Sequence, residues 1–312
     1  MERTDAAVSS EQITMKWAGV RGQILTDVSM KRYTSMRVGG KVSYLIYPED
    51  QTDLTETVRM AREHGIAYRF LGNGTNVIVS DQGFDGAVIR MRKMAGLRFS
   101  RVTQGVQAHA GGGGSLKGLI KECAGRGLSG IEKLFGIPGT VGGAIKMNAG
   151  SFGSVISDHL TEITSVDENG VSRTIGRDGL SLGYRTSGLN ESDCVTSADF
   201  LLKEKDKASI KADMEYVWGQ RVSKHPMEWP SAGSVFKNKN GRPAWQAIDS
   251  AGLRGFRFGD ACLSPKHPNF IVNLGHASAL DVKRLIEKVK KEVYEKLGTV
   301  MEEEVELWGF NG

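Results

Sequence analysis

The spacing of apolar and polar residues predicts a chain in which helices and strands are interspersed. Alternating positions rich in β-branched and aromatic side chains predict strands at residues 42–47, 66–71, 77–79 and 87–91. Helical spacing predicts helices at residues 52–64, 115–124, 206–218, 244–250 and 278–297. In the last of these, Ser278 and Asp281 resemble a capping box and Gly298 is a stop signal. The mixture indicates an α+β fold.

Two further segments have strand character. Asn169-Gly170 lies between the segments 162–167 and 171–175, and Asn-Gly is a strong hairpin signal. The chain ends in a predicted strand at residues 300–308. One face of that strand would carry three acids: Glu302, Glu304 and Glu306. A run of acids near a C-terminus is usually a solvated face.

Glycine is concentrated in one part of the chain, because 19 of its 40 glycines lie between Gly72 and Gly150. The loop 72–76 joins two predicted strands, so it is not the strand-to-helix loop of a Rossmann or P-loop phosphate site. It can be a hairpin turn, which its local sequence favours, or an anion-binding nest. Residues 136–150 hold five glycines, which suit main chain lying against a flat ligand, although a tight connection between strands is the alternative.

The string Gly125–Gly130 has the G-x-G-x-x-G spacing of dinucleotide sites. It follows a predicted helix rather than a strand, and no acidic residue stands about 20 positions further on, as that fingerprint requires. We therefore interpret it as a helix end followed by a loop.

The composition indicates an ordinary folded protein of about two domains, with 312 residues, 39% apolar and 25% charged. The net charge of +5 is spread along the chain, which fits an anionic small molecule and gives weak support for nucleic acid. The three cysteines form no CxxC pair and the six histidines show no metal-ligand spacing, so we expect no disulfide framework and no metal. With no apolar signal segment and no membrane insertion, we expect a cytoplasmic protein.

Six motifs resemble, in order along residues 34–309, the bacterial UDP-N-acetylenolpyruvoylglucosamine reductase (MurB) family of flavoenzymes. The motifs are Thr34–Gly40, Leu71–Val79, Gly136–Gly143 with Asn148–Gly150, Gly183–Ser187, Ser231–Asn238 and Met301–Val305. Six motifs in family order are far more specific than any one of them alone. At 312 residues the chain resembles the shorter subtype of the family.

The resemblance implies a domain organisation and a reaction. It implies an N-terminal segment at residues 1–33, an FAD-binding domain of the vanillyl-alcohol-oxidase (PCMH) type at 34–204 and an α+β substrate-binding domain at 205–312. In the implied reaction, NADPH reduces bound FAD, and hydride from reduced FAD reduces the enolpyruvyl group of UDP-N-acetylenolpyruvoylglucosamine. The product would be UDP-N-acetylmuramate, a peptidoglycan precursor.

By resemblance, the cofactor contacts come from the glycine-rich loops, at Gly72, Asn73, Gly74, Thr75, Asn76, Pro138, Gly139, Thr140, Gly142, Gly143, Asn148 and Gly150. Arg185 would bind the substrate carboxylate, since a guanidinium grips a carboxylate with two hydrogen bonds. Ser234 would protonate the α-carbon and Glu304 would stabilise the enol-like intermediate. Lys224 and Asn238 match family positions that contact the substrate.

Two departures from the family pattern leave alternatives open. Glu302-Glu-Glu304 stands where the family often has Glu-Pro-Glu, so Glu302 is a second candidate for the functional acid. Lys239 follows Asn238 where proline is frequent. The competing functions are another FAD-dependent oxidoreductase of the same fold and a non-enzymatic nucleotide- or nucleic-acid-binding protein, which would carry no chromophore.

Overall fold

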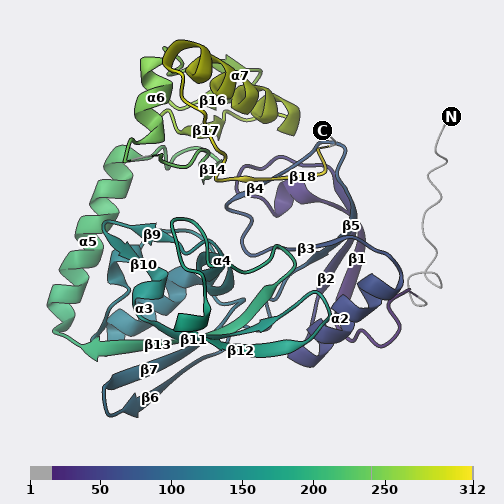
Figure 1. The fold of residues 1–312 in the computed structure, drawn as a ribbon, viewed down its shortest axis with the longest axis vertical. Coiled ribbons are helices and arrows are strands. Elements are labelled where there is room, and N and C mark those ends of the chain that lie inside the picture. Colours follow the sequence, from purple (N-terminus) through teal and green to yellow (C-terminus); the bar gives the residue numbers. More distant parts are fainter. Residues whose placement is uncertain (1–15, 240, 311–312) are drawn as a thin grey trace.

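The computed structural model describes residues 16–239 and 241–310, which form three sheet-containing regions (Figure 1). The first region holds a four-stranded sheet in the order β1-β2-β5-β3. Its strands are β1 (Gln23–Ser29), β2 (Lys41–Tyr47), β3 (Tyr68–Phe70) and β5 (Phe84–Ile89). Helix α2 (Gln51–Glu63) begins at Asp50, whose carboxylate accepts from the main-chain N–H of Asp53. Its buried Leu54 and Val58 pack with Ile89 of β5.

The second region holds a five-strand path in the order β12-β11-β13-β7-β6. These strands are β6 (Leu97–Val102), β7 (Gly105–Gly111), β11 (Leu160–Val166), β12 (Ser172–Gly176) and β13 (Cys194–Glu204). Helices α3 (Leu116–Arg126) and α4 (Val141–Lys146) share one apolar core with β13, centred on the fully buried Phe200. The short strands here are β8 (Leu128–Ser129), β9 (Gly150–Ser151) and β10 (Ser154–Val155).

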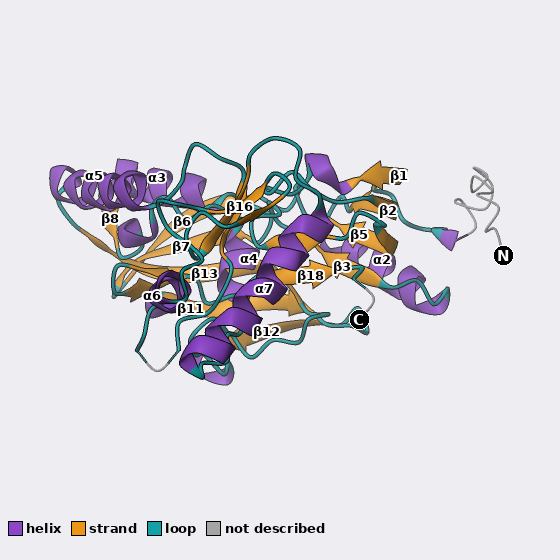
Figure 2. Cartoon of the chain, turned by 90° about the horizontal axis from the view of Figure 1, so that it is seen from above, coloured by secondary structure: helices purple, strands orange, loops and turns teal. Residues whose placement is uncertain are grey.

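The third region is C-terminal and is reached through the long helix α5 (Lys207–Lys224), drawn in green in Figure 1. It holds a sheet in the order β14-β17-β16-β15. Its elements are β14 (Ser231–Ser234), α6 (Ala244–Ser250), β15 (Arg257–Phe258), β16 (Ala261–Leu263), β17 (Phe270–Asn273) and α7 (Ala279–Leu297). Helix α7, seen along its whole length in Figure 2, buries an apolar stripe that includes Val282, Ile286 and Val289.

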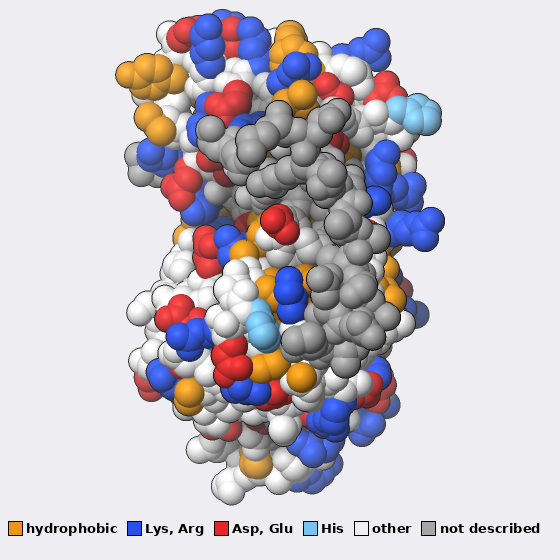
Figure 3. Space-filling model, turned by 90° about the vertical axis from the view of Figure 1, so that its right-hand side faces the viewer, with side chains coloured by type: hydrophobic (Ala, Val, Ile, Leu, Met, Phe, Trp, Pro, Cys, Tyr) orange, Lys and Arg blue, Asp and Glu red, His pale blue; other side chains and the backbone are white. Residues whose placement is uncertain are grey.

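Short 3-10 helices fill four of the connections: Met30–Arg32, Glu132–Leu134, Ile156–Asp158 and Arg177–Gly179. On the face shown in Figure 3, Lys and Arg side chains are interspersed with Asp and Glu side chains.

The C-terminal region is joined to the first region by two contacts between segments far apart in the sequence. Strand β18 (Glu306–Trp308) returns to pair in parallel with β4 (Val77–Val79). Asp81, which follows β4, accepts from the main-chain N–H groups of Ala279 and Leu280 at 2.9 Å each. The first turn of α7 therefore receives acceptors from the first region in addition to its own cap at Ser278.

Most of the predicted elements are confirmed, with small shifts at their ends. The helix at 244–250 is found with the predicted bounds, and β11 and β12 form the predicted hairpin around Asn169-Gly170. Gly127, inside the G-x-G-x-x-G string, ends α3 with φ +74, so the string is a helix end. Helix α5 continues to Lys224, beyond the predicted end at Trp218.

Two interpretations are wrong. The loop 72–76 is not a hairpin turn, because β3 pairs with β5 whereas β4 pairs with β18. The predicted strand at 300–308 shrinks to Glu306–Trp308. The residues before it form an irregular segment against the C-terminal region, where Val235 accepts from the N–H of Glu304 at 2.7 Å. The alternation of acids and apolar residues was thus read over too long a stretch.

Candidate active site

Two loops far apart in the sequence meet beside α4. One joins β3 to β4 and the other leads into α4. Thr75 Oγ1 donates to the main-chain oxygen of Pro138 at 3.3 Å. A Cβ on Gly72 would lie 2.6 Å from Thr140 Oγ1. The two loops are therefore in contact, and no side chain fits at Gly72.

Two further glycines in these loops are required by close main-chain contacts. Gly74 has φ +63, and a Cβ there would lie 2.1 Å from the main-chain oxygen of Tyr33. A Cβ on Gly142 would lie 2.8 Å from the main-chain oxygen of Val195. The predicted residues Asn73, Asn76, Gly139 and Gly143 lie on the same loops or in the first turn of α4, and Gly150 opens β9.

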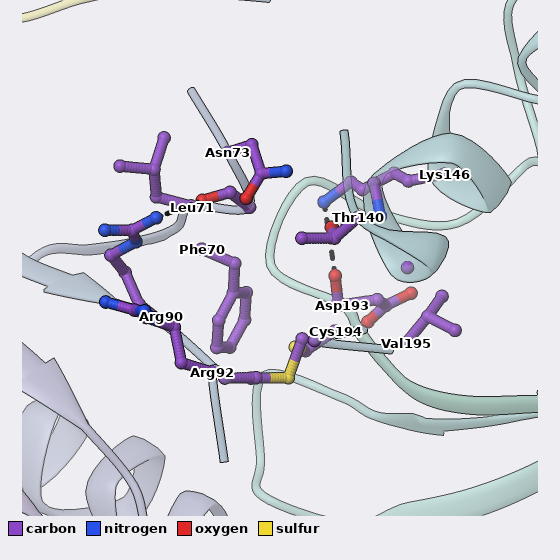
Figure 4. A pocket seen from close by; sticks show the side chains of 15 residues that line it. Phe70, Leu71, Asn73, Arg90, Arg92, Thr140, Lys146, Asp193, Cys194 and Val195 are labelled. Carbon is purple, nitrogen blue, oxygen red and sulfur yellow. Dashed lines mark hydrogen bonds between the residues drawn. The ribbon is translucent and has the colours of Figure 1, made fainter. Parts of the chain in front are cut away.

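A cavity lies between these loops (Figure 4), lined by glycines and asparagine on one side and by cationic side chains on the other. Arg90 Nη2 donates to the main-chain oxygen of Gly72 at 2.9 Å. Lys146 Nζ donates to the main-chain oxygens of Glu191 and Asp193. Burial lowers the pKa of Lys146. The cavity thus combines uncovered main chain with positive charge.

These residues fit a phosphate-bearing dinucleotide such as FAD. Glycines let main chain approach phosphate oxygens, and Arg90 and Lys146 supply charge of the complementary sign. Asn148, just beyond α4, donates from Nδ2 to the main-chain oxygen of Gly183 at 2.9 Å. Its Oδ1 is buried with no hydrogen-bond partner among the described residues. An orphaned acceptor of this kind is explained by a ligand that completes the site.

Arg185 and Glu304 form a second cluster. Arg185 Nε donates to Glu304 Oε1 at 2.6 Å, and the two side chains are 21% and 13% exposed. Burial raises the pKa of Glu304, and the charge of Arg185 opposes that rise. Asn76 Nδ2 donates to the main-chain oxygen of Glu304 at 2.9 Å. The glycine-rich loop therefore holds the segment that carries the acid.

Ser234 lies next to this pair. It ends β14, and the main-chain oxygen of the following Val235 accepts from the N–H of Glu304 at 2.7 Å. Ser35 Oγ lies 2.7 Å from the main-chain oxygen of Ser231 and 3.1 Å from that of Gly74. Strand β14 is thus fastened to the loop 72–76. The structure brings Ser234, Arg185 and Glu304 together, as the sequence motifs suggested.

Of the two predicted substrate contacts, Asn238 is close to this cluster. Its main-chain N–H donates to the Tyr184 hydroxyl at 3.2 Å, and its Oδ1 accepts from the N–H of Ala244 at 2.9 Å. The ring of Tyr184 in turn lies 5.1 Å from the guanidinium carbon of Arg185. Lys224 is the exposed last residue of α5, and it makes no contact with the cluster among the described residues.

The structure separates the two candidate acids. Glu302 is 63% exposed and pairs with Lys237, which lowers its pKa. Glu304 faces Arg185 and is mostly buried. Glu304 is therefore the acid that the fold directs into the site.

Sequence analysis missed Arg221, which is buried beside the second loop and donates to Phe135 and Ser151. The helix prediction ended at Trp218, so no pattern placed it. It missed Ser35 for another reason, because that side chain acts through contacts distant in sequence. Extending the helical periodicity to Lys224 would have included Arg221.

Two searches of the described residues concern other kinds of site. Across residues 16–239 and 241–310, no three His, Cys, Asp or Glu side chains converge in a way that could hold a metal ion. None of the helices described there is long and apolar enough to cross a membrane.

Comparisons with known proteins agree with this division of the chain. Residues 42–176 match the family described as "FAD binding domain". Residues 225–308 match "UDP-N-acetylenolpyruvoylglucosamine reductase, C-terminal domain". The first match covers both glycine-rich loops, and the second covers Ser234 and Glu304.

Full-length relatives carry the same name. The UDP-N-acetylenolpyruvoylglucosamine reductase of Syntrophus aciditrophicus is 41% identical over 294 residues, 94% of either chain. That of Geobacillus kaustophilus is 38% identical and covers 96% of this chain and 98% of its own. The crystal structure of the Thermus caldophilus enzyme superimposes with a TM-score of 0.77 at 37% identity, over 92% of this chain and 99% of the other. The chain belongs to the UDP-N-acetylenolpyruvoylglucosamine reductase family, with an FAD-binding domain of the PCMH type.

Proposed function

We propose that this protein reduces UDP-N-acetylenolpyruvoylglucosamine to UDP-N-acetylmuramate, with FAD as bound cofactor and NADPH as reductant. The observation that carries the proposal is the position of the Arg185–Glu304 pair. It lies against Ser234 and is hydrogen-bonded through Asn76 to the loop that lines the glycine-rich cavity. A carboxylate-binding cation, an acid and a hydroxyl thus stand beside a site that fits FAD.

The division of labour follows the domains. Residues 34–204 would bind FAD, residues 205–312 would bind the UDP-sugar, and residues 1–33 form the N-terminal segment. When bound, FAD supplies two-electron chemistry that amino-acid side chains lack. The loops at 72–76 and 138–143 would hold it, together with Asn148 and Gly150. We place the enzyme in the cytoplasm, with neither metal nor nucleic acid as partner.

The side chains around Ser234 match the needs of the substrate. Reduction of an enolpyruvyl double bond leaves negative charge on the α-carbon and its carboxylate, so a cation at that carboxylate stabilises the transition state. Arg185 is placed and oriented for this by Glu304. Ser234 would then donate the proton to the α-carbon. Glu304, with its raised pKa, could share or return that proton.

The remaining polar groups suit the nucleotide end of the substrate. Tyr184 and Asn238 form one wall beside Arg185. Lys224, exposed at the end of α5, would meet the UDP diphosphate as a point charge once the ligand spans that distance.

An anaerobic absorption experiment tests the proposal. The purified protein should show the flavin bands, NADPH should bleach them, and UDP-N-acetylenolpyruvoylglucosamine should restore them. A preparation that stays colourless after refolding with FAD would support a non-enzymatic nucleotide-binding protein instead. A flavin that is bleached and then reoxidised only by oxygen would favour another oxidoreductase of the same fold.

A further inference from the structure

Arg221 of α5 is a buried cation without an anionic partner in the described structure. The residue is 8% exposed. Its Nε donates to the main-chain oxygen of Phe135 at 3.2 Å and its Nη2 to Ser151 Oγ at 2.8 Å. Both acceptors are neutral. No carboxylate among the described residues is close enough to raise the pKa of Arg221.

The charge is present and uncompensated. Burial and the nearby charge of Arg185 lower the pKa of Arg221 to about 10, so the guanidinium is still protonated at neutral pH. Taking an ion out of water without a counter-ion is unfavourable. Arg185 has Glu304 as its counter-ion, whereas Arg221 has none among the described residues. A neutral donor could make the same two hydrogen bonds, so the hydrogen bonds alone do not explain the charge.

The contacts of Arg221 place it at both ends of the second glycine-rich segment. Phe135 directly precedes Gly136, and Ser151 directly follows Gly150. A Cβ on Gly136 would lie 2.7 Å from Arg221 Cδ, so the chain there is pressed against the arginine. No hydrogen bond from Nη1 to a described residue is found, which leaves its two hydrogens for a ligand.

We propose that Arg221 stabilises the anionic, two-electron-reduced form of the bound flavin. Oxidised flavin takes up two electrons and one proton to give an anion whose charge lies on the N1–C2 carbonyl edge, and a second proton gives the neutral reduced form. A fixed cation at that edge favours the anion. It therefore raises the two-electron reduction potential and lowers the pKa of N1. The inference rests on the proposed function, because it requires bound FAD.

The test is the reduction potential of protein-bound FAD, measured by anaerobic dithionite titration against a reference dye over a range of pH. Arg221→Gln keeps a hydrogen-bond donor and removes the charge. Lys211→Gln is the matched control, because it removes the same charge from an exposed position on the same helix. We expect Arg221→Gln to lower the equilibrium constant for reduction at least tenfold, or about 30 mV for a two-electron couple, and Lys211→Gln to leave it within twofold.

The pH dependence separates an electrostatic role from a structural one. With Arg221 present, one proton should accompany two electrons near neutral pH. In Arg221→Gln the proton stoichiometry should approach two, so the slope of potential against pH should double. Unchanged potential and slope in an FAD-loaded Arg221→Gln protein would overturn the inference while leaving the proposed function intact. Failure of the wild-type protein to bind FAD would overturn both.

A second arm identifies the anion. UDP binding to the oxidised protein is measured for the same variants. A tenfold loss of UDP affinity with an unchanged potential would assign Arg221 to the nucleotide diphosphate and overturn the flavin assignment. If Arg221→Gln does not retain FAD, Arg221→Lys decides. A wild-type potential and slope in Arg221→Lys supports a role of the charge, and loss of FAD from both variants identifies a structural clamp.

Discussion

Arg185 and Glu304, which are 119 residues apart in sequence, meet at 2.6 Å between Nε and Oε1. Arg185 adopts φ +60, an uncommon conformation for a residue with a side chain. The cluster pays for this conformation through the paired carboxylate and the neighbouring Tyr184 ring, which lies 5.1 Å from the guanidinium carbon. A fixed guanidinium beside Ser234 is the result.

This pair gives a direct test of which acid is functional. Glu304→Gln keeps an acceptor for Arg185 but removes the negative charge and the exchangeable proton. We expect reoxidation of the reduced flavin by the enolpyruvyl substrate to slow about 10²-fold, while reduction by NADPH keeps its rate. Stopped-flow absorbance resolves the two half-reactions.

Glu302→Gln is the matched control, because Glu302 is 63% exposed and pairs with Lys237 on the surface. We expect both half-reactions within twofold of wild type in this variant. The opposite pattern, with Glu302→Gln slow and Glu304→Gln normal, would move the functional acid to Glu302.

A serine that donates a proton gives a different signature. In Ser234→Ala the bound flavin should still be bleached by NADPH, since Ser234 takes no part in that step. Reoxidation by the substrate should slow by about 10²–10⁴-fold, the usual contribution of a positioned proton donor. Ser231→Ala, on the same strand, keeps its main-chain contact with Ser35 and should leave reoxidation unaffected. Normal reoxidation in Ser234→Ala would remove Ser234 from its role.

The sequence predicts local structure well where a residue's own neighbours decide it. Ser278 and Gly298 bound α7 by capping it, and Asn169-Gly170 turns the hairpin through its own backbone preferences. The motifs also led to Arg185, Ser234 and Glu304, which the structure brings together.

The sequence does not predict what distant contacts decide. The loop 72–76 has the composition of a hairpin turn, yet its flanking strands pair with β5 and with β18 from the chain end. The segment 300–305 alternates like a strand, but hydrogen bonds to residues near Val235 hold it in an irregular course. Arg221 has a surface residue's composition and a buried residue's surroundings, because a loop 86 residues earlier in the chain covers it.

The contact between Asp81 and α7 predicts coupled stability of the first and third regions. Asp81→Ala removes acceptors from the N–H groups of Ala279 and Leu280, while the cap at Ser278 stays. We expect a loss of about 1–2 kcal/mol in the free energy of unfolding, measured by urea denaturation. Asp85→Ala, which removes an exposed carboxylate from β5, is the control and should cost less than about 0.5 kcal/mol. Equal losses in the two variants would contradict a capping role for Asp81.

Stability should fall in mild acid because of His225, which follows α5. Its ring packs against Phe270 at 4.9 Å between centroids and against His267 at 5.5 Å. Burial, followed by the charges of Arg221, His267, Lys266 and Lys224, lowers the pKa of His225 to about 4. The unfolded chain, with an ordinary pKa of about 6.5, binds the proton more tightly. The stabilisation is therefore complete above pH 6.5 and is lost as the pH falls toward 4.

The variant His225→Phe isolates this effect, because phenylalanine keeps an aromatic ring against Phe270 and cannot take up a proton. Between pH 8 and pH 5 the loss of unfolding free energy should be smaller in this variant than in wild type by about 1–2 kcal/mol, allowing for partial solvent screening. Urea denaturation at the two pH values measures the difference. The control is His64→Gln, which removes an exposed imidazole from the end of α2 and should leave the pH dependence as it is in wild type. An identical acid loss in His225→Phe and wild type would show that His225 stays neutral in the unfolded chain as well or that another group dominates.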